Sequence, residues 1–185
     1  MKKLVLVAVL LLGFSVMALA QDVPKVELFG GYSFMKCDAG AGNTDVSCNL
    51  NGWDISANFV GNKYLGILVD LSGYYGQATD QSRGFGPDVK FHSFLFGPKF
   101  SIRSGKVTPF MQGLFGVAHI NADLGTTTTS ENEFAMAFGG GLDVHLNDTI
   151  DIRPAQLEYL ASKSDSDFLN HFRYTAGIVF KLGKR

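Results

Sequence analysis

The strongest constraint on this chain is a two-residue alternation of apolar and other side chains that recurs in eight segments of the sequence. In the first segment, Val26, Leu28 and Tyr32 fall on one face, whereas Glu27 and Ser33 fall on the other. Successive side chains of a β-strand point to opposite faces of a sheet, so each segment predicts a strand. The apolar faces contain no Asp, Glu, Lys or Arg, and the charged residues lie on the opposite faces.

The alternation predicts strands at 26–34, 53–59, 65–75, 92–100, 111–117, 134–145, 150–159 and 172–182. The seventh segment breaks the pattern, because Arg153 and the pair Gln156 and Glu158 fall on opposite parities. Pro154 lies between them, and a proline inside a sheet usually marks an edge or a bulge. We therefore expect a bulge near Pro154 and Ala155 that brings Gln156 and Glu158 onto the charged face.

The connections between the predicted strands alternate in length. The connections at 61–63, 103–106 and 147–148 are short, whereas those at 35–50, 76–90, 121–133 and 161–170 are long. Short turns on one side of the membrane and long loops on the other are typical of barrels that cross an outer membrane. The chain is thus predicted to be all-β, an eight-stranded antiparallel up-and-down transmembrane β-barrel, with both termini in the periplasm.

The first twenty residues read as a signal peptide. Lys2 and Lys3 precede an apolar run from Leu4 to Met17, and Ala18-Leu19-Ala20 fits a cleavage site. This apolar run is shorter than a membrane-spanning helix requires, which disfavours a transmembrane anchor. We assign residues 1–20 to the signal peptide and 21–185 to the barrel, in the outer membrane of a Gram-negative bacterium.

The charged faces distinguish this barrel from a soluble, secreted lipocalin. A lipocalin would place apolar side chains inside and polar ones outside, and charges facing its cavity would be costly. Inside a transmembrane barrel, charged side chains are normal. We predict a lumen charge network of five acids and four bases: Glu27, Asp54, Asp70, Lys99, Asp143, Arg153, Glu158, Arg173 and Lys181.

An eight-stranded barrel has an interior just wide enough for side chains to fill, so the predicted network should plug the lumen. Unpaired charges in such a lumen would be expensive, and the near-equal numbers favour mutual pairing. The last strand should neighbour the first and the seventh, so we expect Arg173 to reach Glu27 or Glu158. An open porin is disfavoured by the small number of strands.

Cys37 and Cys48 are the only cysteines. An exported chain meets an oxidising compartment, and an even number of cysteines favours pairing. The residues between them include several Gly, Asn and Asp, which bend easily. We predict a disulfide that closes the first external loop.

Several segments together resemble a known family. They are Val26 to Ser33, Phe96-Gly97-Pro98-Lys99-Phe100, Phe138 to Asp143, and Tyr174 to Phe180. In this order they are similar to the small eight-stranded outer-membrane barrels of the OmpA/OmpX type. The resemblance implies a barrel surrounded by outer-membrane lipids and lipopolysaccharide, which meets the barrel-assembly machinery during biogenesis. The chain ends within the barrel region, so the peptidoglycan-binding domain of full OmpA proteins, with its wall-tethering role, is not expected.

Signals for other chemistry are weak. The formal net charge of −1 gives no basic field for nucleic acid. His92 and Ser93 are adjacent and would point to opposite faces, so they cannot act as base and nucleophile together. His92 and His119 should lie nearly opposite each other on the outward face, but two imidazoles are too few ligands for a metal. We expect no enzymatic activity, metal or cofactor.

Two function classes follow from the sequence. The first is a structural outer-membrane protein that has a plugged lumen and displays surface loops. The alternative is a surface adhesin or ligand-binding barrel that acts through those loops, and a lipid A-modifying enzyme is less favoured. The predicted loops are mainly polar, with Phe85 and Phe168 as exceptions, which favours the first class. The sequence does not identify a surface partner.

Overall fold

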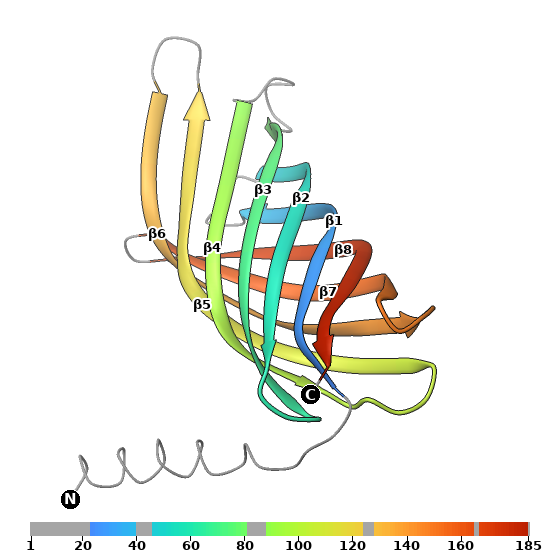
Figure 1. The fold of residues 1–185 in the computed structure, drawn as a ribbon. Coiled ribbons are helices and arrows are strands. Elements are labelled where there is room, and N and C mark those ends of the chain that lie inside the picture. The colour runs from blue at the N-terminus through green and yellow to red at the C-terminus, as the bar shows by residue number, and fades with distance from the viewer. Residues whose placement is uncertain (1–22, 40–45, 81–87, 124–127, 165–166, 185) are drawn as a thin grey trace, which may run out of the picture.

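The computed structural model describes residues 23–39, 46–80, 88–123, 128–164 and 167–184 as a closed barrel of eight strands (Figure 1). Each strand is antiparallel to its neighbours, and β1 closes the barrel by pairing with β8. The strands are β1 Pro24–Ala39, β2 Val46–Val60, β3 Leu65–Asp80, β4 Asp88–Ser101, β5 Val107–Asp123, β6 Thr128–His145, β7 Ile150–Ser164 and β8 Asp167–Lys184. The predicted fold class is confirmed. No helix in these ranges is long and apolar enough to cross a bilayer.

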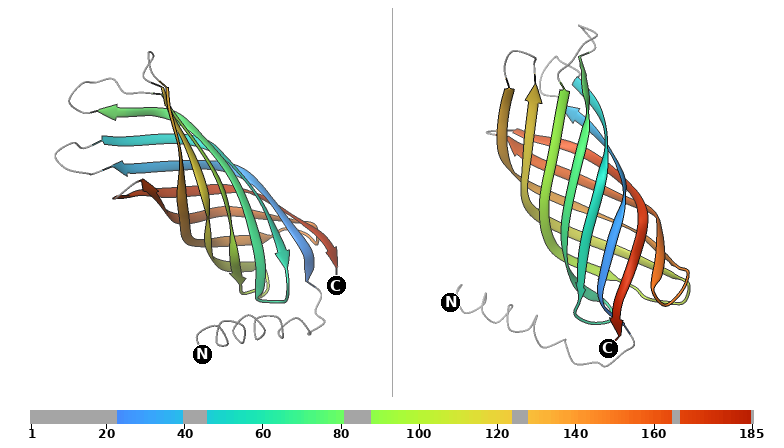
Figure 2. Two further views of the ribbon diagram at one scale, coloured as in Figure 1. Left: turned by 90° about the vertical axis from the view of Figure 1, so that its left-hand side faces the viewer. Right: turned by 45° about the horizontal axis from the view of Figure 1, so that its top comes forward.

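The three predicted tight turns are present and lie at one end of the barrel, which we call the turn end (Figure 2). In the β2–β3 turn, Asn62 Oδ1 accepts hydrogen bonds from the backbone N–H groups of Tyr64 and Leu65. Asn147 makes the equivalent two contacts in the β6–β7 turn. Gly105 in the β4–β5 turn has a φ of 66°, which a residue with a Cβ rarely adopts. Asn and Gly thus fix the turn end by local chemistry.

The predicted extents of the four long loops are wrong. At the opposite end, which we call the loop end, β1 continues to Ala39 and β2 begins at Val46, inside the loop predicted at 35–50. The other three pairs of strands extend in the same way, to 80 and 88, 123 and 128, and 164 and 167. The barrel is therefore longer than its apolar alternation indicates.

The reason lies in a swap of polarity between the two faces of the sheet. Over most of the barrel the outward face is apolar and exposed, with members from every strand that include Leu28, Ile55, Ile67, Phe96, Phe115, Phe138, Leu157 and Ile178. We call this surface the apolar band. Nearer the loop end, the outward positions become polar: Lys36, Asn49, Gln77, Lys90, Asn121, Asn132 and Asn170. A pattern search for outward apolar residues therefore stops before the strands do.

The interior changes in the opposite sense. Behind the apolar band it holds buried charged and polar side chains, whereas towards the loop end it holds a buried, mostly apolar cluster. Members of this cluster are Met35, Cys37, Cys48, Leu50, Tyr74, Phe91, Ala118, Ala135 and Leu160. The loop end thus has the inside-apolar, outside-polar organisation of a barrel in water.

The bulge predicted on β7 is present. The pairing of β7 with β8 shifts register between Arg153 and Gln156, so that Gln156 and Glu158 are buried in the lumen and Leu157 is exposed. The same extra residue of β7 shifts its pairing with β6, between Leu142 and Val144. The β7 bulge matters for the site because it aims three consecutive inward side chains, at 153, 156 and 158, into one network.

Candidate functional site

The lumen behind the apolar band is filled by charged side chains, and Arg153 on β7 organises the part nearer the turn end. Its Nε and Nη2 donate to the two carboxylate oxygens of Asp143 at 2.6 and 3.0 Å. Its guanidinium also lies over the rings of Phe29 and Phe110, at 4.3 and 4.4 Å from their centroids. Bidentate pairing and two aromatic faces together offset much of the cost of burying this cation.

Glu27 on β1 holds a second group of charges in the same region. Its Oε1 accepts from Arg103 Nη2 at 2.6 Å, and its Oε2 accepts from Asn58 Nδ2 at 2.8 Å. Lys99 Nζ lies 3.6 Å from both Glu27 Oε2 and Asp143 Oδ2. Lys99 therefore joins the Glu27 and Arg153 groups.

Arg173 on β8 occupies the middle of the lumen and is fully buried. Its Nε donates to Glu158 Oε2 at 2.7 Å, and its Nη1 lies 3.3 Å from Asp70 Oδ1 and 3.7 Å from Asp54 Oδ2. The same Nη1 donates to Ser72 Oγ at 3.1 Å. One guanidinium thus faces three carboxyl groups. Neither oxygen of Asp54 has a hydrogen-bond partner within the described residues.

Gln156 connects the two arginine groups. Its Oε1 accepts from Arg153 Nη1 at 2.7 Å, and its Nε2 donates to Glu158 Oε2 at 2.7 Å. Glu158 Oε1 accepts from Gln112 Nε2 at 2.8 Å. A continuous chain of polar contacts therefore runs from Glu27 to Arg173, and we call it the lumen network.

Glycine makes room for this network. A Cβ placed on Gly139 of β6 would collide with the backbone oxygen of Leu157 and lie 2.6 Å from Cγ of Glu158, closer than packed atoms allow. Gly139 is the direct pairing partner of Glu158 in the sheet. Its missing side chain leaves the space in which the Glu158 carboxylate turns towards Arg173.

The structure places all nine residues of the predicted charge network on the inward face, but not in one cluster. Eight belong to the groups around Glu27, Arg153 and Arg173. Lys181 lies apart near the turn end, where its Nζ is 2.6 Å from Asp151 Oδ1 and bonds to the backbone oxygen of Asn147 at 3.0 Å. Of the two partners predicted for Arg173, Glu158 is the one that it contacts. The other, Glu27, contacts Lys99 and Arg103 instead.

The sequence did not identify several partners of the predicted charges, among them Arg103, Asp151 and Gln156. Arg103 was assigned to a turn, Asp151 to an inward position without a role, and Gln156 to the lumen without a partner. The predicted bulge at Pro154 could have indicated that Gln156 contacts the charges, since it turns Gln156 into the lumen beside Glu158. The reach of Arg103 back into the lumen, where its Nη1 also donates to the Lys63 backbone oxygen, has no sequence signal.

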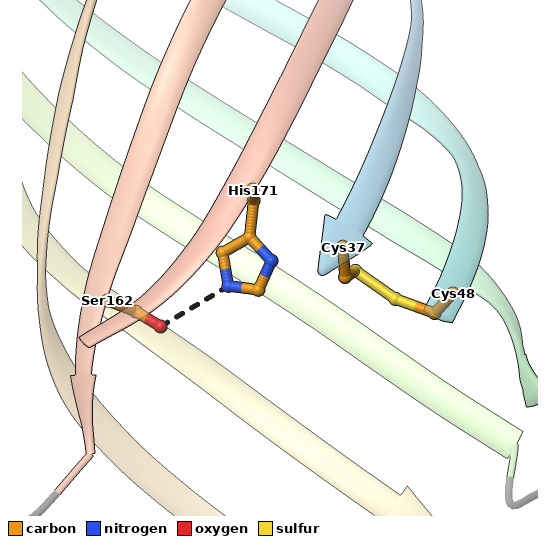
Figure 3. Close-up of a disulfide and its surroundings, with 4 residues drawn as sticks. All are labelled: Cys37, Cys48, Ser162 and His171. Atoms are coloured by element: carbon orange, nitrogen blue, oxygen red, sulfur yellow. Dashed lines mark hydrogen bonds between the residues drawn. A yellow bond between two sulfur atoms is a disulfide. The ribbon is translucent and has the colours of Figure 1, made fainter. Parts of the chain in front are cut away.

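The loop end of the lumen holds the Cys37–Cys48 disulfide (Figure 3). The two residues are directly paired across β1 and β2 and face the interior, so the disulfide lies inside the barrel wall and joins two strands. His171 on β8 is the pairing partner of Cys37 on its other side. Its Nε2 is 3.4 Å from Ser162 Oγ, and its ring stands edge-to-face with Phe91.

The candidate catalytic and metal pairs are separated or incomplete. Ser93 faces inward and bonds to Ser72 Oγ at 2.7 Å, whereas His92 faces outward and its Nε2 is 3.0 Å from Tyr75 Oη. His92 and His119 are direct pairing partners on β4 and β5, as the sequence predicted. Within the described ranges, no group of three or more His, Cys, Asp or Glu is arranged to hold a metal ion.

Comparison with known proteins identifies the family. The family model for the outer membrane protein beta-barrel domain matches residues 6–183 of this chain. The chain belongs to this family. Comparison with curated proteins gives no significant match.

Solved structures share the fold. Neisserial surface protein A superposes with a TM-score of 0.70 at 16% identity, over 85% of this chain and 97% of the other. OprG of Pseudomonas aeruginosa gives a TM-score of 0.61 at 12% identity, over 88% and 98%. Ail, the attachment invasion locus protein of Yersinia pestis, gives 0.58 at 20% identity, over 85% and 99%. At these identities the likeness shows the fold alone.

Proposed function

We propose that the protein is a structural component of the outer membrane of a Gram-negative bacterium, with a lumen closed by its own side chains. The observation that carries this proposal is the lumen network, in which charged groups from seven strands pair with one another across the interior. Lys99, Arg153 and Arg173 are each at most 2% exposed, which leaves no wide aqueous path past them. The proposal assigns no enzymatic step to the chain.

The apolar band supports residence in a bilayer. Its exposed side chains surround the barrel, and a closed barrel satisfies its backbone hydrogen bonds without water. Outer-membrane lipids, lipopolysaccharide among them, would cover this band. The short turns at the turn end favour a periplasmic position for that end and for both termini, because outer-membrane barrels have short turns on the periplasmic side. Assembly by the barrel-assembly machinery is part of the same proposal.

Planar-bilayer recording tests the closed lumen. We expect no steady ion conductance from the wild-type barrel over a range of voltages, because the network fills the cross-section. Steady conductance by wild-type protein that is shown to be folded would refute the proposal. A variant with Arg153 and Arg173 both replaced by Ala supplies a matched comparison, since it removes two large side chains from the constriction and should leak if it folds.

Attachment through the loops is the competing function. One solved structure shows Ail in complex with the heparin analogue sucrose octasulfate, which makes a sulfated glycan a suitable probe. This chain has a formal net charge of −1, so we expect it not to bind a polyanion at physiological salt. Retention of the folded barrel on immobilised heparin at that salt concentration would favour the adhesin function.

A further inference from the structure

Three residues at the loop end form a row across β2, β1 and β8. Cys37 is paired with Cys48 on one side and with His171 on the other, and all three side chains face the interior. Figure 3 shows the imidazole beside the disulfide, with Ser162 on the opposite side of the ring. The row lies beyond the lumen network, within the mostly apolar cluster of the loop end.

One nitrogen of His171 lacks a partner. Nε2 is 3.4 Å from Ser162 Oγ, but the buried Nδ1 has no hydrogen-bond partner among the residues that the structure describes. Figure 3 shows Nδ1 on the edge of the ring that faces Cys37. A buried polar atom without a partner destabilises the state in which it occurs, and a disulfide has no hydrogen to donate.

We propose that the Cys37–Cys48 disulfide is a site at which small thiols exchange. The small thiol attacks the sulfur of Cys48, and the Cys37 thiol that is released donates a hydrogen bond to His171. In this arrangement Nε2–H donates to Ser162, which leaves the lone pair of Nδ1 directed towards Cys37. Reduction then supplies the donor that Nδ1 lacks in the oxidised protein. The imidazole therefore favours the reduced form and selects which sulfur leaves.

The exchange is balanced with the thiol as the only co-reactant. The thiolate of the small thiol attacks Sγ of Cys48, a new S–S bond forms, and the Cys37–Cys48 bond breaks with its electron pair going to Cys37. Cys37 takes a proton from solvent and donates it in a hydrogen bond to His171. A second small thiol attacks the mixed disulfide, releases Cys48 as a thiol, and leaves as the oxidised small-molecule disulfide.

Both cysteine residues retain a little exposure to solvent. Cys48 is 8% exposed and Cys37 is 6% exposed, near the loop end of β2 and β1. Cys48 has no imidazole beside it in the row. Exchange would break the covalent link between β1 and β2 near their connection and leave the lumen network intact.

A redox titration tests the proposal. The folded protein in detergent is equilibrated with mixtures of reduced and oxidised glutathione, quenched with acid, alkylated and analysed by mass spectrometry. We expect His171→Phe to need about a 10-fold more reducing mixture for half-reduction than wild type, because the acceptor for the Cys37 thiol is lost. The control His92→Phe makes the same change on the outward face and should titrate as wild type. Equal midpoints for His171→Phe and wild type would overturn the inference.

The position of the mixed disulfide is an independent test. Brief exposure to glutathione followed by acid quenching and proteolysis should place glutathione on Cys48, and its presence on Cys37 would contradict the assigned order. If His171→Phe does not fold, nitrogen NMR of wild-type histidines replaces it. Reduction should then change the Nδ1 resonance of His171 and leave Nε2 protonated, and an unchanged Nδ1 would refute the contact.

Discussion

Arg173 is the residue whose loss should most damage the barrel. Its guanidinium donates to Glu158 at 2.7 Å and to Ser72 at 3.1 Å, and it is the cation nearest to Asp70 and Asp54. Arg173→Ala leaves these carboxyl groups buried without that cation. Removing one partner of a buried ion pair typically costs about 3–5 kcal/mol, because the remaining charge is not compensated. We expect a loss of unfolding free energy of this size.

Urea unfolding in detergent, followed by the gel mobility of unheated samples, measures this loss. The second-site variants identify its cause. Glu158→Gln in the Arg173→Ala background removes an orphaned charge and should recover about 1–3 kcal/mol. Glu27→Gln should recover nothing, since Glu27 is paired with Lys99 and Arg103. An Arg173→Ala barrel as stable as wild type, or equal rescue by both second changes, would refute the assigned pairing.

Three further predictions use the same unfolding assay. Asp54→Asn should be neutral or stabilising, because neither Asp54 oxygen has a hydrogen-bond partner in the described part of the chain and the change removes one of three carboxylates facing one guanidinium. A loss above about 2 kcal/mol would contradict this. Gly139→Val should destabilise the barrel, because its Cβ would collide with the backbone of Leu157 and with Glu158, and Gly30→Val, with open space around it, is the control that should not. Val69→Arg, in the middle of the apolar band, should cost about 2–4 kcal/mol and Tyr75→Arg, near its edge, much less, so equal costs would argue against membrane burial.

The fold could be predicted from the sequence because each strand carries its own evidence. Two-residue alternation fixes which face is apolar, and Asn62, Gly105 and Asn147 mark turns by local hydrogen bonds or backbone freedom. The bulge at Pro154 followed from a break in the alternation and from the proline that lies there. Such signals are local. In this barrel each strand pairs with its neighbours in sequence, so among the strands that the structure describes the pairing of β1 with β8 is the one long-range pairing that the local signals do not give.

The lumen contacts could be predicted only in part. Parity places a side chain inside, but the contact between Arg173 and Asp70 spans 103 residues, from β8 to β3 across the interior, and depends on the tilt of the strands. Lys181 shows how little the alternation says about contacts. It lies on the inward face, as predicted, but too near the turn end to join the lumen network. The length of the strands was missed because outward polarity changes within a strand.

That change of polarity explains why one barrel contains two kinds of interior. Where lipid covers the wall, apolar side chains belong outside, and the narrow interior receives the polar ones; Arg153 and Arg173 are tolerable there because carboxylates and amides bond to them. Beyond the apolar band the wall meets water, so residues such as Lys36 and Asn132 face outward and Leu50 and Phe91 pack inside. The loop end therefore gains stability from apolar burial, as a soluble barrel does. A disulfide there adds a covalent link between strands where the membrane no longer supports the wall.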